Sequence, residues 1–190
     1  MYQKYQSEAL VLKSRESGEA DKIFTLFTKD FGLVRARATS VRSEKSRMRY
    51  ALQNYARANA ALVKGKRGWR LAGAAAHKGA TGDSRGVAAF ARIAELTIRL
   101  VHGEEKNDYL FAALSDAHDA LMVEKCDAFG TIEIVCVARM LYALGYISTE
   151  ALSTALFTHT AYTGESLVEA ETMKDKLLSS INKAIAETHL

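Results

Sequence analysis

The stretch Val34-Arg35-Ala36-Arg37-Ala38-Thr39 decides the fold of this chain. Small apolar residues occupy every second position, and polar or cationic residues occupy the positions between them. A period of two is typical of a β-strand, because successive side chains of a strand point to opposite faces. We therefore expect a barrel wall here, with the apolar residues facing the core and the arginines facing outward.

Four other segments of the first 80 residues have the composition of strands. The predicted strands are residues 8–14, 22–28, 55–64 and 69–75, with turns at 15–21, 30–32 and 65–68. A long basic loop, residues 40–49, separates the third strand from the fourth. Five short strands around a long central loop fit a five-stranded Greek-key barrel of the OB type. Periodicity alone does not separate this barrel from an SH3-like one.

The rest of the chain has helical spacing, after a linker with three glycines in residues 78–86. Helices are predicted at residues 87–101, 108–123, 129–144, 149–157 and from 172 onward, with a less regular stretch at 158–171. The helix at 129–144 is apolar on almost every side and should be the central one. The predicted fold class is α+β, with an OB-fold domain at residues 1–79 and an α-helical domain for packing and partner binding at residues 80–190.

Charge divides the chain at the same place. The 190 residues have a formal net charge of +4, but residues 1–80 hold 17 Lys and Arg against 6 Asp and Glu. The remaining residues hold 9 against 16, so the first segment carries +11 and the second −7. Such asymmetry suggests a basic module for a polyanion joined to an acidic packing module.

The cations are densest between residues 35 and 70, where Glu44 is the one opposing acid in the sequence. Cations along a barrel groove hold phosphates and aromatic rings stack bases, which is how single strands are bound. The alternative is that these side chains only solvate the barrel, but their density favours nucleic acid. Trp69, beside the cationic turn, either stacks a base or plugs the end of the barrel.

Several other protein classes find no support in the sequence. No run approaches the roughly 18 uncharged apolar residues that span a bilayer, and residues 1–6 lack the apolar stretch of a signal peptide. Cys126 and Cys136 form neither a disulfide framework nor a metal-binding spacing, so a reducing cytoplasm is expected. Residues 65–68 lack the frame of a phosphate-binding loop, and no nucleophile has a partner base in view. We expect no enzyme, no metal and no cofactor.

An ordered series of short motifs runs along the chain. It begins with residues 8–15 (EALVLKSR), 18–23 (GEADKI) and 26–32 (LFTKDFG), and continues at 41–47, 51–55 and 63–69. Residues 140–146 (MLYALGY) and 185–190 (IAETHL) extend it into the helical half. The series resembles RecO, a family of bacterial recombination mediators, strongly over residues 8–69 and loosely after residue 82.

The resemblance implies an OB fold followed by helices, and a non-catalytic protein associated with the nucleoid in the bacterial cytoplasm. RecO-like proteins bind single- and double-stranded DNA, anneal complementary strands and associate with RecR. They also engage the acidic tail of the single-stranded-DNA-binding protein, so that RecA can load on coated DNA. The DNA-contact residues implied here are Arg35, Arg37, Arg42, Lys45, Arg47, Arg49, Lys64, Lys66 and Arg67, with Trp69 beside them.

The chain also departs from the family. Many members carry a cysteine-rich zinc module after the Leu-Gly-Tyr turn, whereas residues 147–161 hold no cysteine, so we expect a trimmed form without zinc. The candidate residues for an acidic tail are Arg92, Arg99 and Arg139. Arg92 and Arg99 share a helix stripe with Arg85, which either receives an acidic peptide or pairs with acids of the same bundle. Arg139, on the apolar central helix, should find a carboxylate within the bundle or at an interface.

Two other kinds of protein stay compatible with these patterns. One is a generic OB-fold RNA-binding protein with a helical docking domain, and the other is an adaptor whose basic half binds an acidic protein. Affinities for single-stranded DNA and RNA of one sequence separate the first, because a reader of the 2′-hydroxyl favours RNA.

Overall fold

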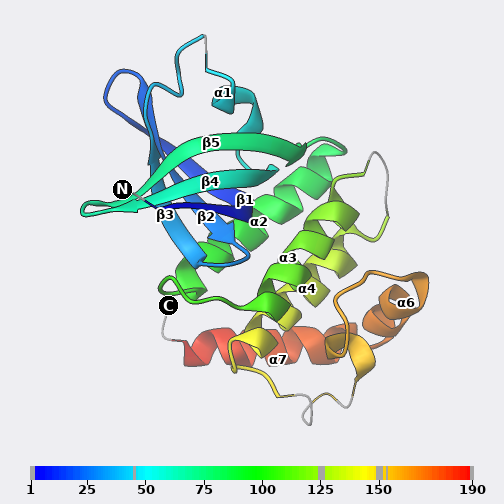
Figure 1. Cartoon of the computed structure of the whole chain (residues 1–190). Coiled ribbons are helices and arrows are strands. Elements are labelled where there is room, and N and C mark those ends of the chain that lie inside the picture. Colours follow the sequence, from blue (N-terminus) through cyan, green and yellow to red (C-terminus); the bar gives the residue numbers. More distant parts are fainter. Residues whose placement is uncertain (1–2, 45, 124–126, 149–151, 153, 189–190) are drawn as a thin grey trace. The chain divides into compact units, whose positions relative to one another are not determined.

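The structure is a computed structural model of the chain and describes residues 3–44, 46–123, 127–148, 152 and 154–188. It divides into two compact units, one of Met1–Ala80 with Leu100–Asn107 and one of Thr81–Arg99 with Asp108–Leu190. The strands belong to the first unit, and the helices from α3 onward belong to the second (Figure 1).

Five strands close into a barrel in the order β1-β2-β3-β5-β4. They are β1 (Lys4–Ser17), β2 (Asp21–Thr28), β3 (Gly32–Ala38), β4 (Arg57–Gly65) and β5 (Gly68–Lys78). A short helix, α1 (Met48–Ala51), lies in the connection from β3 to β4. β3 and β5 pair in parallel, and the other neighbours pair antiparallel. The closed barrel followed by helices confirms the predicted fold class, an OB fold with a helical C-terminal part.

The burial of alternate residues in β3 confirms the predicted period of two. Val34, Ala36 and Ala38 are fully buried in the core, together with Phe24 and Leu26 of β2, whereas the residues between them are exposed. β3 opens at Gly32, whose φ is +60° and whose Cβ position is filled by the backbone carbonyl of Glu105. A side chain at Gly32 would therefore push segment 100–107 away from the start of β3.

β1 is twice as long as the predicted first strand, residues 8–14. Its first half, from Lys4 to Leu10, pairs with β4, and residues from Ala9 to Ser17 pair with β2. The register shifts between Val11 and Lys13, where the strand changes from one neighbour to the other. The residues before Glu8 form part of the strand because they pair with β4 and so close the barrel. This pairing is a long-range contact, which their own composition does not indicate.

The helical unit is built around α4 (Phe129–Ala143), as its apolar sequence predicts. α4 contacts α3 (Asp108–Leu121), the 3-10 helix η1 (Ala155–Phe157), α6 (Gly164–Thr172) and α7 (Lys174–Glu187). α2 (Ser84–Leu100) precedes these helices in the chain. Residues 149–151, 153 and Cys126, on which some sequence predictions rest, lie outside the described residues.

A regular helix, α6, occupies part of the stretch 158–171 that was predicted to be less regular. Thr163 caps it by accepting a hydrogen bond from the backbone N–H of Ser166 (3.2 Å). Only Ser166 and Ala170 of this helix are buried, so it lacks the apolar stripe on which helix prediction depends. Within the described part of the chain, no helix is both long and apolar enough to cross a membrane.

Candidate nucleic-acid interface

Two arginines of β3 face outward, because the strand places alternate residues on opposite faces. Arg35 and Arg37 are exposed, and the parallel register sets Arg37 directly opposite Arg70 of β5. A shallow pocket of about 250 Å³ lies beside this pair and is lined by Thr39, Leu71 and both arginines. Arg70 belongs to the dense basic stretch of the sequence but not to the predicted contact set; only the β3–β5 register brings it to Arg37.

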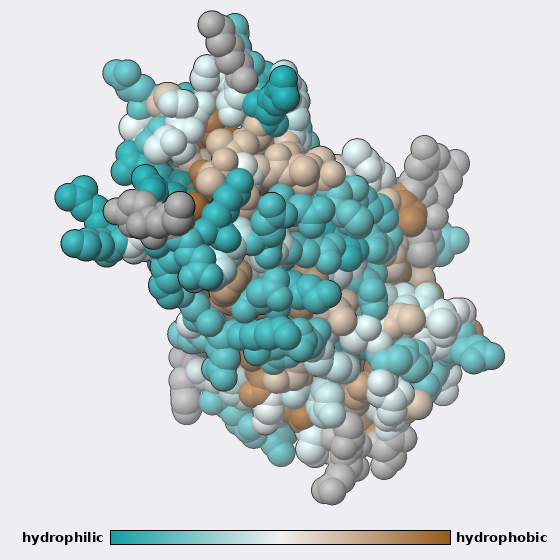
Figure 2. Space-filling view, in the orientation of Figure 1, coloured by the Kyte–Doolittle hydropathy of each residue, from teal (hydrophilic) through white to brown (hydrophobic). Residues whose placement is uncertain are grey.

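The tip of the β4–β5 hairpin adds two more exposed cations. Lys66 and Arg67 occupy the turn between Gly65 and Gly68, which face each other in the register. Gly68 has a φ of +99°, which a side chain would disfavour. Figure 2 shows hydrophilic side chains gathered at this tip, at the left of the view. The turn therefore presents its charges to solvent.

The long loop after β3 carries Arg42, Arg47 and Arg49, all exposed, whereas Lys45 lies outside the described residues. The backbone N–H of Arg42 donates to the carbonyl oxygen of Ala20 (3.0 Å), which ties the loop to the β1–β2 turn. Arg47 stands at the N-terminal boundary of α1, and the guanidinium of Arg49 lies 5.2 Å from the ring centre of Tyr50. The loop is thus anchored to the barrel at Arg42.

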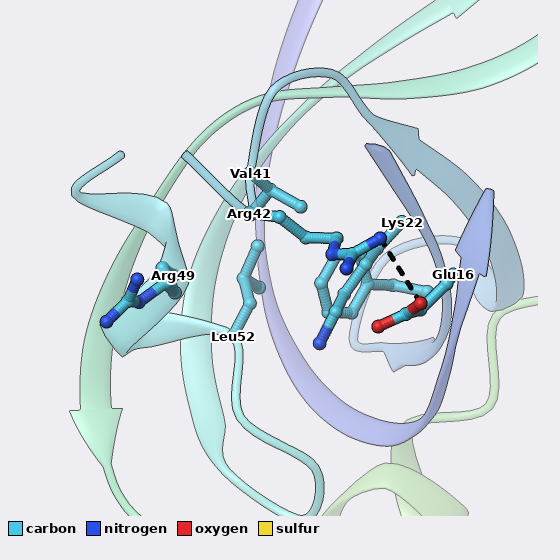
Figure 3. Close-up of a pocket in the computed structure, with 7 residues that line it drawn as sticks. Glu16, Lys22, Val41, Arg42, Arg49 and Leu52 are labelled. Carbon is cyan, nitrogen blue, oxygen red and sulfur yellow. Dashed lines mark ion pairs between the residues drawn. The ribbon is translucent and has the colours of Figure 1, made fainter. Parts of the chain in front are cut away.

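A second pocket, of about 210 Å³, opens between this loop and the β1–β2 turn (Figure 3). Its apolar lining comes from the barrel core, namely Phe24, Val41 and Leu52. Its charged lining includes Lys22, Arg42 and Glu16. Neither Lys22 nor Glu16 was predicted to be a site residue, because the sequence does not show that they face the loop.

Three of the predicted contact residues form exposed ion pairs. Arg37 pairs with Asp21 (2.8 Å), Arg42 pairs with Glu16 (3.2 Å) and Lys64 pairs with Glu104 (2.8 Å). Exposed pairs of this kind contribute only about 0–1 kcal/mol each, so a phosphate can compete for the cation. In the part of the chain that the structure describes, five predicted contact residues have no acidic partner: Arg35, Arg47, Arg49, Lys66 and Arg67.

Asp21 and Glu104, the acids that pair with Arg37 and Lys64, have lowered pKa values. The backbone N–H of Ser40 and then the Arg37 guanidinium lower the pKa of Asp21. The Lys64 ammonium lowers the pKa of Glu104, with a smaller contribution from the indole N–H of Trp69. That indole nitrogen is buried and makes no hydrogen bond of regular geometry. The acids therefore stay charged at neutral pH and orient the cations beside them.

Trp69 packs inside the barrel end, which is one of the two roles expected for it. Its side chain is 5% exposed, and its ring centre lies 5.1 Å from that of Phe31 and 5.8 Å from that of Tyr5. The Lys64 ammonium lies 5.1 Å from the indole centre. These neighbours cover the indole, so a base would have to displace them before it could stack on Trp69.

In the helical unit, Arg92 pairs with an acid of the same bundle. Its Nε and Nη2 donate to the two carboxylate oxygens of Glu133 at 2.7 and 2.6 Å, and this contact raises the pKa of Arg92. Arg85 pairs with Asp83 in a similar way (3.0 Å). Arg99 is exposed, and no acid among the described residues pairs with it. Of the stripe formed by these arginines, Arg99 is the one left open to a partner.

Arg139 is fully buried, and its partners differ from the carboxylate that the sequence predicts. Its guanidinium donates to the carbonyl oxygens of Leu156 (2.8 Å), Thr160 (2.6 Å) and Ala161 (3.3 Å), and lies 4.7 Å from the ring centre of Tyr162. The three carbonyls belong to η1 and the segment after it, where no regular ladder satisfies them. Arg139 therefore holds segment 155–162 against α4, and an acidic tail has no access to it in this structure.

No group of three or more His, Cys, Asp or Glu side chains is arranged to hold a metal ion in the described ranges. Cys136 is fully buried in α4, and burial raises the pKa of its thiol to about 12.

Comparison with known proteins shows similarity in the N-terminal part of the chain. Residues 1–73 match the family described as Recombination protein O N terminal. A DNA repair protein RecO of Desulfitobacterium hafniense is 45% identical over 62 residues, which cover 33% of this chain and 23% of the relative. The RecO of a Thermoanaerobacter species is 32% identical over 120 residues, covering 60% of this chain and 48% of that relative. The RecO of Bifidobacterium animalis subsp. lactis is 45% identical over 62 residues, covering 33% of this chain and 26% of that protein.

The matched part of this chain thus spans between 23% and 48% of the length of these relatives. The matched residues contain all of β1, β2 and β3, with the arginines of β3 and the basic loop among them. The similarity of this chain to RecO proteins therefore lies in its N-terminal barrel.

Proposed function

We propose that the chain is a non-catalytic DNA repair and recombination protein that binds single- and double-stranded DNA on its barrel. The observation that carries the proposal is the set of exposed cations of the barrel and its loop without an acidic partner among the described residues: Arg35, Arg47, Arg49, Lys66 and Arg67. Phosphate oxygens supply the missing anions, and release of counterions from DNA then gives affinity without sequence preference. Arg37, Arg42 and Lys64, held in weak surface pairs, extend the same surface.

The finer part of the proposal concerns what the bound DNA is used for. The chain anneals complementary strands and, with RecR, helps load RecA on DNA coated by the single-stranded-DNA-binding protein, in the bacterial cytoplasm where this DNA lies. The support is the similarity of residues 1–73 to the N-terminal part of recombination protein O, together with a second, helical unit. For the acidic tail of the coating protein, the exposed Arg99 is the favoured contact, because Arg92 is paired and Arg139 is buried. The proposal requires no metal and no cofactor.

The deciding experiment is annealing of complementary oligonucleotides that are each coated with the cognate single-stranded-DNA-binding protein. Faster annealing with the chain than without it supports the proposal, because both DNA binding and engagement of the coat are needed. Annealing of naked strands alone would restrict the proposal to DNA binding by the barrel. No binding to either form would overturn it, and tighter binding to RNA than to DNA of one sequence would favour the RNA-binding alternative.

Salt dependence tests the interface itself. With about five phosphates contacted on single-stranded DNA, log affinity should fall with log salt at a slope near −3.5. Replacing Arg47 and Arg49 with Gln together should flatten the slope by roughly 1.4 if both contact phosphates. An unchanged slope would remove the loop that carries them from the interface.

A further inference from the structure

The pocket between the β1–β2 turn and the basic loop is lined by a carboxylate of the protein, that of Glu16, beside cationic side chains. Glu16 and Lys22 are directly opposite each other in the β1–β2 register, so their side chains leave the same face of the sheet. The Arg42 guanidinium reaches Glu16 from the loop, with Nη1 3.2 Å from Oε2. Figure 3 shows the Glu16 carboxylate gathered with these two cations, whereas the Arg49 guanidinium points away from them.

Backbone hydrogen bonds and core packing hold the residues that line this pocket. The backbone N–H of Arg42 donates to the carbonyl of Ala20 (3.0 Å), and its side chain also donates to the carbonyl of Gly18 (3.4 Å). Val41 and Leu52, which line the pocket, are 2% and 4% exposed and belong to the barrel core. Arg42 is therefore held by two backbone carbonyls of the β1–β2 turn, and these contacts do not involve Glu16.

The contact between Glu16 and Arg42 is weak in comparison. The Glu16 side chain is 64% exposed and that of Arg42 is 37% exposed, so water screens the pair. A phosphodiester offers two non-bridging oxygens and a terminal phosphate offers three, and either group can make bidentate bonds to a guanidinium. A phosphate that binds the guanidinium in this way can therefore replace the single contact of the Glu16 carboxylate without moving the barrel.

We infer that this pocket is a phosphate subsite of the nucleic-acid interface, in which the Glu16 carboxylate is the resident anion that an incoming phosphate replaces. The inference rests on the proposed function and adds to it a specific site and a built-in competitor. Arg42 and Lys22 contact the phosphate, and Glu16 swings out to solvent. Either a backbone phosphodiester or a terminal phosphate has the required chemistry.

The test compares two substitutions that change the charge equally. Glu16→Gln removes the resident anion, whereas Glu19→Gln removes an exposed charge from the same β1–β2 turn outside the pocket lining. We expect Glu16→Gln to tighten binding of single-stranded DNA by about two- to five-fold at low salt, the scale of one exposed ion pair. The salt slope should steepen by up to about 0.7, since the phosphate releases its counterion and no displaced Glu16 carboxylate then takes up a cation. Glu19→Gln should change affinity by less than half as much.

A double substitution shows whether the gain passes through Arg42. In an Arg42→Gln background, Glu16→Gln should no longer tighten binding, because the cation that the carboxylate masked is gone. A gain that persists there, or equal gains from Glu16→Gln and Glu19→Gln, would overturn the subsite while DNA binding by the unsubstituted chain still stands. The Glu16 and Glu19 comparison decides the matter even if Arg42→Gln fails to fold. Absence of DNA binding by the unsubstituted chain would instead overturn the proposed function.

Two oligonucleotides identify which phosphate is bound. An equal gain on 5′-hydroxyl and 5′-phosphorylated strands assigns the subsite to a backbone phosphate. A gain in affinity confined to the phosphorylated strand assigns the subsite to the phosphate at the strand end. In that case, inorganic phosphate should inhibit DNA binding by the Glu16→Gln variant more strongly than DNA binding by the Glu19→Gln variant.

Discussion

Arg37 of β3 and Arg70 of β5 lie directly opposite each other in the parallel pairing that joins these two strands. Like charges placed opposite each other on one face destabilise a sheet. Asp21 relieves part of this repulsion, because it accepts hydrogen bonds from the Arg37 side chain (2.9 Å) and from the backbone of Ser40 (2.8 Å). A pair of facing arginines on a barrel surface is the arrangement that a polyanion stabilises.

Arg70→Gln should therefore weaken DNA binding although it removes a repulsion within the barrel. We expect the salt slope on single-stranded DNA to flatten by about 0.7, the share of one phosphate contact. Lys183→Gln, an exposed cation on α7 of the helical unit, makes the same charge change as a control. Affinities measured over a range of salt concentrations test this, and equal slopes for the two variants would remove Arg70 from the interface.

Trp69 should behave as a core residue. Trp69→Ala is expected to lower the free energy of unfolding by about 3–5 kcal/mol, because a large buried ring leaves a cavity. Trp69→Phe should retain most of the packing and nearly all of the DNA affinity. Urea denaturation and DNA titration of both variants provide the measurement. A folded Trp69→Phe variant that lost about 1–3 kcal/mol of binding would instead indicate that the indole stacks on a base.

Arg139 should matter for stability rather than for partner binding. Arg139→Met keeps the length of the side chain but leaves three carbonyl oxygens without their donor. Since an unsatisfied buried group costs about 1–3 kcal/mol, we expect a loss of about 2–5 kcal/mol in the free energy of unfolding, measured by urea denaturation. Arg99→Met, on an exposed site, should change it by less than about 0.5 kcal/mol. A stable Arg139→Met variant with weakened binding of an acidic peptide would contradict this role.

Cys136 should make the folded protein less stable at alkaline pH. Its thiol ionises near pH 9.0 when exposed by unfolding, but burial raises the folded pKa to about 12. The unfolded state therefore loses this proton first, and the free energy of unfolding should fall as pH rises above 9. Cys136→Ala should remove that part of the pH dependence in urea denaturation series at pH 8 and pH 10.

Thiol labelling gives an independent measurement of the same burial. In a Cys126→Ala background, Cys136 should react with a thiol reagent only when the helical unit opens, because the thiolate is the nucleophile. Rapid labelling at pH 8 without denaturant would show that the site around α4 is accessible.

The helical half shows where sequence patterns succeed and where they fail. α4 could be predicted as the central helix because it is apolar on almost every side, which is a property of the segment alone. α6 could not, because only Ser166 and Ala170 are buried and its start depends on a single threonine cap. The partners of Arg139 could not be predicted either, since they are backbone carbonyls from a segment about 20 residues away.

In the barrel, too, some features follow from the sequence and others only from the tertiary structure. The alternation of residues 34–39 and the excess of cations before residue 80 follow from the sequence by itself, because strand period and net charge are local sums over neighbouring residues. The tertiary structure alone decided that Arg37 faces Arg70, that Glu16 occupies the pocket of Arg42, and that Trp69 is covered. Each of these depends on strand register and on loops that return from 26 or more residues away, and register is set by closing the whole barrel around one core.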